Sequence, residues 1–189
     1  MKTYIYMVRH CDSPKEGEER TRGLTELGKK GVRSVTEILK KEKIDLIVSS
    51  PYLRATLTVQ QLAEEIGQEV MIYEDLRERV FTVKETRMSD SELMPLIKKS
   101  FDDDSFSLTG AESNSECRKR AIEILQKLLI THKGHKVVIS THAVIMTLMM
   151  GYYDIKYGLD FLLNTTKPDI YRMEFENQDL LQVERLVNG

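Results

Sequence analysis

The order of apolar segments in this sequence predicts an α/β fold: a three-layer αβα sandwich around a mostly parallel sheet with an antiparallel edge. Short, continuously apolar runs alternate with amphipathic segments through most of the chain, as in buried strands covered by helices on both faces. Near the end, two apolar runs flank a polar turn and predict a hairpin. The length of 189 residues predicts one domain, residues 1–189.

Composition excludes several functional classes. The 28 Lys and Arg residues against 30 Asp and Glu residues give a net charge of −2, so binding of nucleic acid through bulk positive charge is not expected. Continuous apolar runs are far shorter than the ~20 residues of a membrane helix, and no membrane partner is expected. The 2 cysteines cannot form a disulfide framework, which favours a reducing, cytoplasmic location.

The N-terminal third predicts a strand followed by a helix. Residues 3–8 form a compact β-prone run, and we expect a strand there. Thr25 is suited to cap the next helix. The expected apolar face of that helix consists of Leu27, Gly31, Val35 and Ile38. Gly28 and Gly31 lower helix propensity, so we expect them to mark close packing against a neighbouring segment.

The next segments repeat this pattern. Residues 45–49 predict a buried strand, and Ser50-Pro51 directly after it is typical of a helix start, with Ser50 as the cap. The following amphipathic helix is expected to end near Gly67, because glycine readily adopts the left-handed conformation of a helix end. Residues 70–73 predict a third strand.

The second half contains one irregular stretch. Residues 79–111, with a helical piece around 91–100, are interpreted as a lid-like excursion over one end of the sheet. A helix over 112–132, a strand over 136–140 and an apolar helix over 143–150 are expected to follow. The predicted hairpin pairs residues 170–175 with 180–186, and this apolar hairpin is a candidate for pairing in a homodimer.

Polar side chains follow each predicted strand. Ligands of open α/β sheets bind beyond the carboxyl ends of the strands, so these residues are expected to converge there. They are Arg9, His10, Cys11 and Asp12 after the first strand, Ser49, Ser50 and Arg54 after the second, Arg77, Glu78 and Arg79 after the third, and Thr141 and His142 after the fourth. Four strand ends therefore each supply a group compatible with phosphate.

Such a set is suited to phosphoryl transfer. Guanidinium groups bind a phosphate dianion with a fixed, forked geometry. A neutral imidazole can attack phosphorus, a second imidazole can stabilise the equatorial oxygens, and a carboxylic acid can protonate the leaving oxygen. A zinc site at His10-Cys11-Asp12 is disfavoured, because consecutive residues leaving a strand point in different directions. His132 and His135 are better explained by a helix end.

Several motifs resemble the histidine phosphatase superfamily, the phosphoglycerate mutase-like proteins. They occur in the family's order over residues 3 to about 150. The matching segments are Val8-Arg9-His10, Gly23-Leu24-Thr25-Glu26-Leu27-Gly28, Ser49-Ser50-Pro51-Tyr52-Leu53-Arg54-Ala55, Leu76-Arg77-Glu78, Gly110-Ala111-Glu112-Ser113 and Ser140-Thr141-His142-Ala143. The resemblance implies a phosphoglycerate mutase-like α/β fold and an active site without metal or organic cofactor.

The resemblance also implies residue roles. His10 is expected to be the nucleophile that becomes phosphohistidine, and Glu78 the proton donor that later activates water. Arg9, Arg54 and His142 are expected to complete the phosphate pocket. Ala143, Asp12 and Arg22 are further candidates for contact with substrate. Candidate selectivity residues, which could meet a second anionic group, are Arg20, Arg22, Arg79, Lys84 and Arg87.

Two positions depart from the family pattern. Cys11 and Ala143 stand where the family has glycine after each histidine, and a Cβ there could tighten the pocket. Both residues are small, so they could also simply be tolerated. Cys11 is expected near two arginines that favour its thiolate form, which motivates the hypothesis that oxidation of Cys11 inhibits the enzyme.

The sequence predicts a metal-independent phosphomonoesterase. Its substrates are expected to be small phosphorylated metabolites, with inorganic phosphate as a product. The cofactor-dependent mutases of the family that this chain resembles have longer segments over the site, and this sequence lacks them. Phosphoglycerate mutase-type phosphoryl transfer is therefore the second alternative. A weakly active phosphate-binding regulatory module is the third, motivated by Cys11 and Ala143.

Overall fold

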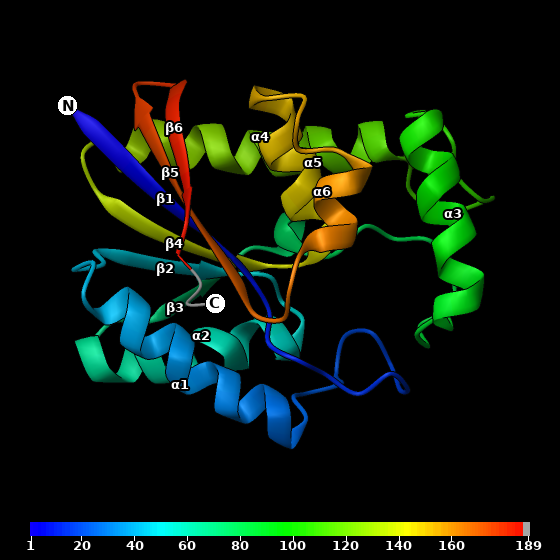
Figure 1. The fold of residues 1–189 in the computed structure, drawn as a ribbon, viewed down its shortest axis with the longest axis horizontal. Helices are drawn as coiled ribbons and strands as arrows, with labels where there is room; N and C mark the ends of the chain where they lie inside the picture. Colours follow the sequence, from blue (N-terminus) through cyan, green and yellow to red (C-terminus); the bar gives the residue numbers. More distant parts are fainter. Residues whose placement is uncertain (187–189) are drawn as a thin grey trace.

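Six strands form one mixed sheet in the computed structural model, which describes residues 1–186 (Figure 1). The strands are β1 (Lys2–Arg9), β2 (Leu46–Ser49), β3 (Val70–Ile72), β4 (Lys136–Thr141), β5 (Asp169–Glu176) and β6 (Asp179–Arg185), in the order β3-β2-β4-β1-β5-β6. Strands β3, β2, β4 and β1 pair in parallel, whereas β5 and β6 add an antiparallel edge. The predicted mixed sheet and the hairpin are confirmed. Residues 187–189, the end of the predicted domain, lie outside the described residues.

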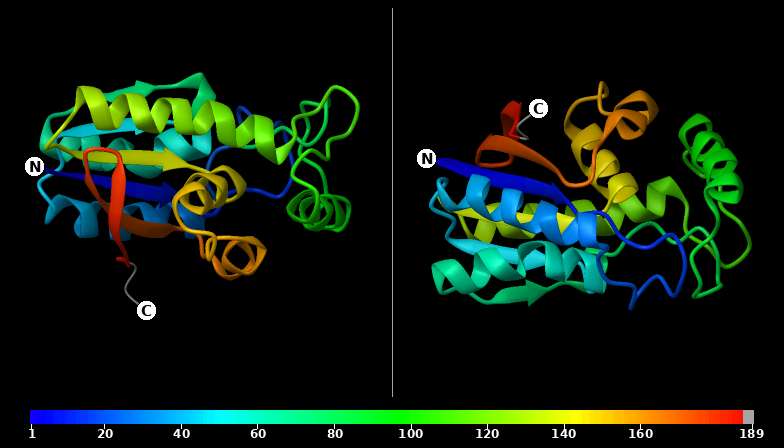
Figure 2. Two further views of the ribbon diagram at one scale, coloured as in Figure 1. Left: turned by 90° about the horizontal axis from the view of Figure 1, so that it is seen from above. Right: turned by 60° about the horizontal axis from the view of Figure 1, so that its bottom comes forward.

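Helices cover both faces of the sheet, which completes the predicted sandwich (Figure 2). They are α1 (Glu26–Lys40), α2 (Leu53–Ile66), α3 (Asp90–Asp102), α4 (Asn114–Thr131), α5 (Ala143–Tyr153) and α6 (Leu159–Asn164), with a 3-10 turn, η1 (Glu74–Leu76). Alternation along β1 serves both layers: Tyr6 and Val8 join the core under α1 and α2, and Ile5 and Met7 join the core under α4 and α5.

The start of α1 is held against the chain that leaves β1. Thr25 caps the helix as predicted: its hydroxyl accepts from the Gly28 N–H and donates to the Asp12 carboxylate. A Cβ on Gly28 would lie 2.1 Å from the Asp12 carbonyl oxygen, which explains the glycine and confirms its close packing. The predicted apolar face was wrong at Leu27, which is 67% exposed, because the buried face is rotated toward Gly28 and Val32.

The predicted start of α2 was also wrong. The helix begins at Leu53 after Tyr52, with no side-chain cap, rather than at Pro51. The Ser50 hydroxyl accepts from the Tyr52 N–H, but it also hydrogen-bonds the buried His142 ring. Ser50 therefore stabilises a turn and contacts a histidine, and it does not cap the helix. The predicted end at Gly67 is confirmed by its left-handed conformation, with φ of 69°.

The excursion at 79–111 contains α3, and this helix stands away from the two faces of the sheet (Figure 1). Ser89 and Glu92 form a capping box at its start, which explains why the helix begins one residue before the predicted piece. Helix α6 was not predicted, because its 6 residues are too few to show a helical period. Among residues 1–186, no helix is both long and apolar enough to cross a membrane.

Candidate active site

A cavity of about 720 Å³ opens beyond the carboxyl ends of the parallel strands. Of the residues proposed from the sequence, it is lined by Arg9, His10, Arg22, Arg54, Glu78 and Ala143. Asp12 and His142 are not among the described residues that line it. The Asp12 carboxylate accepts from the Thr25 hydroxyl at 2.7 Å, so it is engaged at the start of α1.

His10 is held in one tautomer. Its Nδ1 lies 2.6 Å from the Cys11 carbonyl oxygen, which can only accept, so Nδ1 carries the proton. The Arg54 Nε–H donates to His10 Nε2 at 3.2 Å, which places the ring's lone pair at Nε2. Burial, followed by the positive charge of Arg54, holds the pKa of His10 well below its usual value. The ring is therefore neutral at pH 7, the form that a nucleophile needs.

His142 is the N-cap residue of α5 and is fully buried. Its ring centroid lies 5.1 Å from that of His10, and its Nε2 shares a 2.7 Å hydrogen bond with the Ser50 hydroxyl. Nδ1 has no hydrogen-bond partner in the described part of the chain. Burial and the charge of Arg54 hold its pKa well below the usual value. Ser50 thus positions the second histidine, a role that the helix-start pattern concealed.

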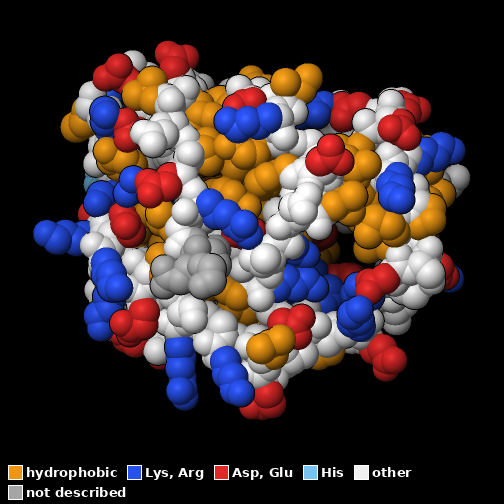
Figure 3. Space-filling view, viewed as in Figure 1, with side chains coloured by type: hydrophobic (Ala, Val, Ile, Leu, Met, Phe, Trp, Pro, Cys, Tyr) orange, Lys and Arg blue, Asp and Glu red, His pale blue; other side chains and the backbone are white. Residues whose placement is uncertain are grey.

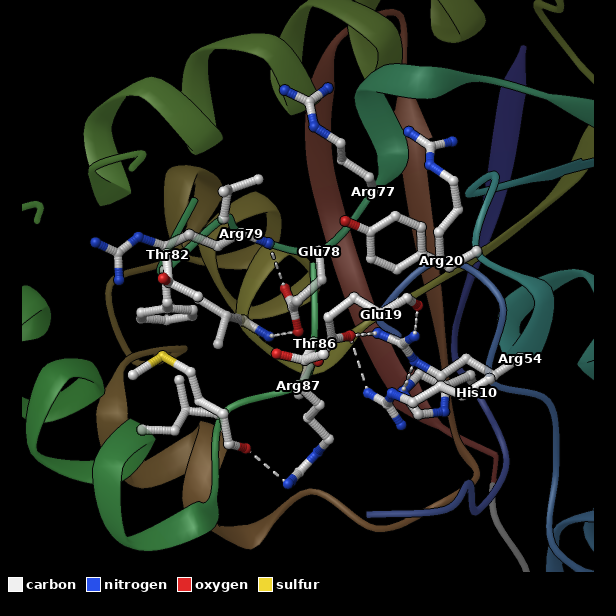
Figure 4. A pocket seen from close by; sticks show the side chains of 18 of the residues that line it. His10, Glu19, Arg20, Arg54, Arg77, Glu78, Arg79, Thr82, Thr86 and Arg87 are labelled. Carbon is white, nitrogen blue, oxygen red and sulfur yellow. Dashed lines mark hydrogen bonds and ion pairs between the residues drawn. The ribbon is translucent and has the colours of Figure 1, made fainter. Parts of the chain in front are cut away.

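Arg54 contacts both His10 and a carboxylate. Its Nη1 donates to the Glu19 carbonyl oxygen at 2.5 Å, and its Nη2 donates to the Glu19 carboxylate at 2.7 Å (Figure 4). Burial lowers the pKa of Arg54 to about 10, which leaves it cationic at pH 7. Arg22 donates to the same carboxylate at 3.0 Å. An anion that binds the outer nitrogens of Arg54 therefore has to compete with Glu19, which sequence reasoning missed.

Arg9 is the second guanidinium beside His10. Its Nη1 donates to the carbonyl oxygen and to the hydroxyl of Thr165, at 2.9 and 2.5 Å. Its Nε is buried and has no hydrogen-bond partner among residues 1–186. Burial lowers the pKa of Arg9, and no carboxylate forms an ion pair with it within those residues. Arg9 therefore presents a largely desolvated charge to the cavity, and the carboxylates of Glu78 and Asp169 partly offset the effect of burial on its pKa.

Glu78 lies at the N-terminus of α5. Its carboxylate accepts from the backbone N–H groups of Arg79, Val144 and Ile145, at 2.9, 3.1 and 3.0 Å. Two of these donors belong to the first turn of α5, where free N–H groups favour an anion. The contacts fix the carboxyl group on the wall of the cavity opposite Arg54 (Figure 4).

A partly buried ion pair holds the segment that carries Glu78. Arg120 Nε donates to the Glu112 carboxylate at 2.6 Å, and its other nitrogens donate to the carbonyl oxygens of Asp75, Arg77 and Glu78. Glu112 in turn accepts from the Val80 N–H. These contacts with the backbone on both sides of Glu78 fix the position of its side chain. Of the two residues of the ion pair, Glu112 belongs to a family block of the sequence, whereas Arg120 does not.

The candidate selectivity residues all line the cavity, but most are already engaged. Arg20 donates to Glu74, and Arg87 pairs with Asp90. Arg79 is 3% exposed and donates to the Ser100 hydroxyl and to the Phe106 carbonyl oxygen, so its charge is directed under the excursion. Lys84 has no ion pair within the described residues. Few of the candidate residues are therefore free to bind a second anionic group of the substrate.

Lys167 is a cavity residue that sequence reasoning missed. It lines the wall on the side of Arg9 and forms no ion pair with any residue in 1–186. Burial of its amine, followed by the charge of Arg9, lowers the pKa of Lys167 to about 8, and its charge in turn contributes to the lowered pKa of His10. It lies beyond the family blocks, in a stretch without motif, so no signal singled it out.

Cys11 does not meet the expectation of a reactive thiol. The side chain is fully buried and belongs to the core under α1 and α2, where a Cβ on Gly31 would lie 3.1 Å from its sulfur. Burial raises the pKa of Cys11 to about 11, the opposite direction from a thiolate. Its backbone N–H donates to Thr58. Cys11 lies beyond the end of β1 and joins the same core as Tyr6 and Val8, so the alternation of β1 does not continue to this residue.

A family model described as histidine phosphatase superfamily (branch 1) matches residues 5–187. The chain belongs to this superfamily. No group of three or more His, Cys, Asp or Glu side chains within residues 1–186 is arranged to hold a metal ion.

Individual members of the superfamily share only part of their sequence with this chain. A phosphoglycerate mutase-like protein 4 from Arabidopsis thaliana is 31% identical over 150 residues, which span 73% of this chain and 65% of that protein, just under two thirds of its length. A phosphoserine phosphatase from Entamoeba histolytica, solved with phosphoserine, has a TM-score of 0.79 at 19% identity and covers 97% of this chain and 96% of its own. A mycobacterial glucosyl-3-phosphoglycerate phosphatase has a TM-score of 0.77 at 17% identity, covering 98% and 97%.

Proposed function

We propose that this histidine phosphatase superfamily member is a metal-independent phosphomonoesterase acting through phosphohistidine at His10. The observation that carries the proposal is the neutral His10 ring on the cavity wall, with its Nε2 lone pair beside Arg54. A phosphate dianion placed between Arg9 and Arg54 would take over the Arg54 Nε–H and present phosphorus to the lone pair that this group leaves. The match to the superfamily, which includes phosphatases of small phosphorylated metabolites, supports the same reaction.

The reaction has two balanced steps. In the first, the His10 Nε2 lone pair forms a bond to phosphorus while the bond from phosphorus to the leaving oxygen breaks; Glu78, which must have taken up a proton from solvent when the substrate dianion binds, gives that oxygen its proton. In the second, Glu78 takes a proton from water, the water oxygen bonds phosphorus, and the N–P bond breaks. Arg9 and Arg54 stabilise the phosphoryl oxygens in both steps. The His142 ring packs against the His10 ring and supports it. The excursion at 79–111 covers this site in our proposal.

Glu78→Gln tests the proton-donor role. The wild type is expected to hydrolyse para-nitrophenyl phosphate in EDTA, and the variant to lose much more activity on ethyl phosphate than on para-nitrophenyl phosphate. The nitrophenolate ion leaves without a proton, whereas an alkoxide needs one, so we expect the two losses to differ by at least about tenfold. Steady-state kcat with both substrates measures this. Equal losses would assign Glu78 to positioning α5 alone.

Phosphatase and mutase chemistry differ in the acceptor of the phosphoryl group. The name of the Arabidopsis relative makes the mutase reaction the second candidate. Formation of 2-phosphoglycerate from 3-phosphoglycerate, primed with 2,3-bisphosphoglycerate, distinguishes the two. Release of inorganic phosphate without isomerisation is the expected result.

We also propose that Lys167 binds substrate phosphate as a titrating cation. Its pKa of about 8 means that the charge is present at pH 7 and lost as pH rises toward 9. A phosphomonoester is already a dianion over this range, because its second pKa is about 6. We therefore expect kcat/KM for para-nitrophenyl phosphate to fall about fivefold between pH 7 and pH 9 in the wild type.

Two substitutions separate the charge of Lys167 from its shape. Lys167→Arg keeps the cation at pH 9, and we expect its kcat/KM to fall less than that of the wild type. Lys167→Gln should have a lower kcat/KM than the wild type at pH 7, and this kcat/KM should change little between pH 7 and pH 9. The same pH profile in Lys167→Gln and in the wild type would remove Lys167 from the binding site.

A further inference from the structure

Part of the lining of the active-site cavity is apolar, and three of its side chains are exposed. We call it the apolar wall, and it consists of Val83, Leu93, Met94, Ile97, Leu162 and Leu163. Val83 is 70% exposed, Leu163 48% and Met94 36%. Figure 3 shows hydrophobic side chains on the α3 side of the hollow and Lys and Arg side chains below it. A group of exposed apolar side chains facing one cavity is typical of a binding surface.

The wall is built by two elements that the phosphoryl-transfer step does not use. Leu93 and Ile97 are one helical turn apart on α3, so the excursion presents a continuous apolar face to the cavity. Leu162 and Leu163 contribute from α6 on the other side of the opening. His10 and Arg54 line the same cavity. A ligand can therefore contact the wall and the phosphate-binding groups at once.

Several charges near the wall are paired within the protein, whereas Lys84, next to Val83, has no ion pair among residues 1–186. Lys15 and Arg87 both pair with Asp90 at the start of α3, and Arg20 pairs with Glu74. Apart from Lys84, the cations named here would have to give up their carboxylate partners to bind a second phosphate or carboxylate. The cavity volume of about 720 Å³ also falls in the range that holds drug-sized ligands, well beyond a three-carbon phosphate. Both observations favour an apolar group over a second anion.

We propose that the apolar wall binds the organic part of the substrate, and that the substrate is a phosphomonoester carrying an apolar chain or ring. The proposal rests on the proposed function, because the phosphate end must be bound by Arg9 and Arg54 beside His10. Burial of the apolar group against Leu93 and Met94 supplies the affinity that a small phosphate ester lacks.

Alkylphosphonates test the wall without turnover, because their P–C bond is not hydrolysed. Isothermal titration calorimetry compares ethylphosphonate with hexylphosphonate, which share the anionic group and differ by four methylenes. Each fully buried methylene improves binding about fourfold, so we expect hexylphosphonate to bind at least about tenfold more tightly, with a more negative heat-capacity change. Equal dissociation constants, or no binding of hexylphosphonate, would overturn the proposal.

Met94→Gln and Met71→Gln form a matched pair. Both methionines are partly exposed, at 36% and 43%, but Met71 lies on β3 outside the residues described as lining the cavity. Met94→Gln should reduce the ratio of hexylphosphonate to ethylphosphonate affinity at least about threefold, whereas Met71→Gln should keep the wild-type ratio. The same reduction in both variants overturns the assignment. So does a change of sedimentation coefficient in Met94→Gln alone, which would make the wall an interface between copies.

Failure of this proposal is separable from failure of the proposed function. Hydrolysis of para-nitrophenyl phosphate with equal phosphonate affinities would leave a phosphatase without an apolar subsite. Tight binding of hexylphosphonate without hydrolysis of any phosphate ester would keep the wall and remove the catalytic function. Turnover of ethyl and hexyl phosphate, whose leaving groups are chemically alike, gives the same comparison during catalysis.

Discussion

His10→Ala is expected to reduce kcat for para-nitrophenyl phosphate by at least about 10³-fold. The substitution removes the lone pair that bonds phosphorus, and no phosphohistidine can form. Residual turnover would come from phosphate binding alone, which cannot replace a covalent step. The fold should survive, because the ring occupies the cavity wall and its single backbone partner is the neighbouring Cys11 carbonyl. Steady-state kinetics and circular dichroism measure the two effects.

His135→Ala is the matched control for His10→Ala. His135 is exposed at the opposite end of β4, and it is not among the described residues that line the cavity. Wild-type kcat is expected in this variant. Near-normal turnover in His10→Ala, with intact far-ultraviolet circular dichroism, would refute His10 as the nucleophile.

Arg54→Ala is expected to lower kcat/KM by about 10²–10³-fold. The guanidinium lies against His10 Nε2, where it meets the phosphoryl oxygens as their charge develops in the transition state. Its loss also leaves the Glu19 carboxylate with Arg22 as its cationic partner, so a negative group remains beside the incoming phosphate. We therefore expect both a raised KM and a lowered kcat.

Arg54→Lys and Arg33→Ala bracket this effect. Lysine keeps the positive charge but cannot donate through Nε to His10 while also contacting Glu19, so an intermediate loss is expected. Arg33 is exposed on α1 outside the described lining of the cavity, and Arg33→Ala should behave as the wild type. A loss confined to KM in Arg54→Ala would mean that Arg54 binds substrate without acting in the transition state.

The sheet could be predicted because its signals are local. Apolar runs separated by amphipathic segments define buried strands without reference to the rest of the chain, and the convergence of Arg9, His10 and Arg54 follows from parallel pairing. Glu78 follows the same rule through the short β3 and η1. Helix α6 gave no signal because a helix of 6 residues shows less than two turns of period.

Contacts between distant segments were beyond the sequence. Ser50 matched a helix cap, yet it bonds His142, 92 positions away in the chain. Cys11 was expected beside arginines because it follows His10, but the direction of its side chain depends on how α1 packs against β1. Glu19 and Lys167 lie in stretches without a motif, and only the folded chain brings them to Arg54 and Arg9.

Trapping of the covalent intermediate tests the central claim most directly. The wild type, mixed with para-nitrophenyl phosphate and quenched in alkali within the first turnovers, is digested and analysed by mass spectrometry. We expect one phosphoryl group on the peptide that contains His10, stable in alkali and lost in acid, and none on that peptide in His10→Ala. Turnover that proceeds with the phosphoryl group on another residue, or with no covalent phosphoryl group at any time, would contradict the account.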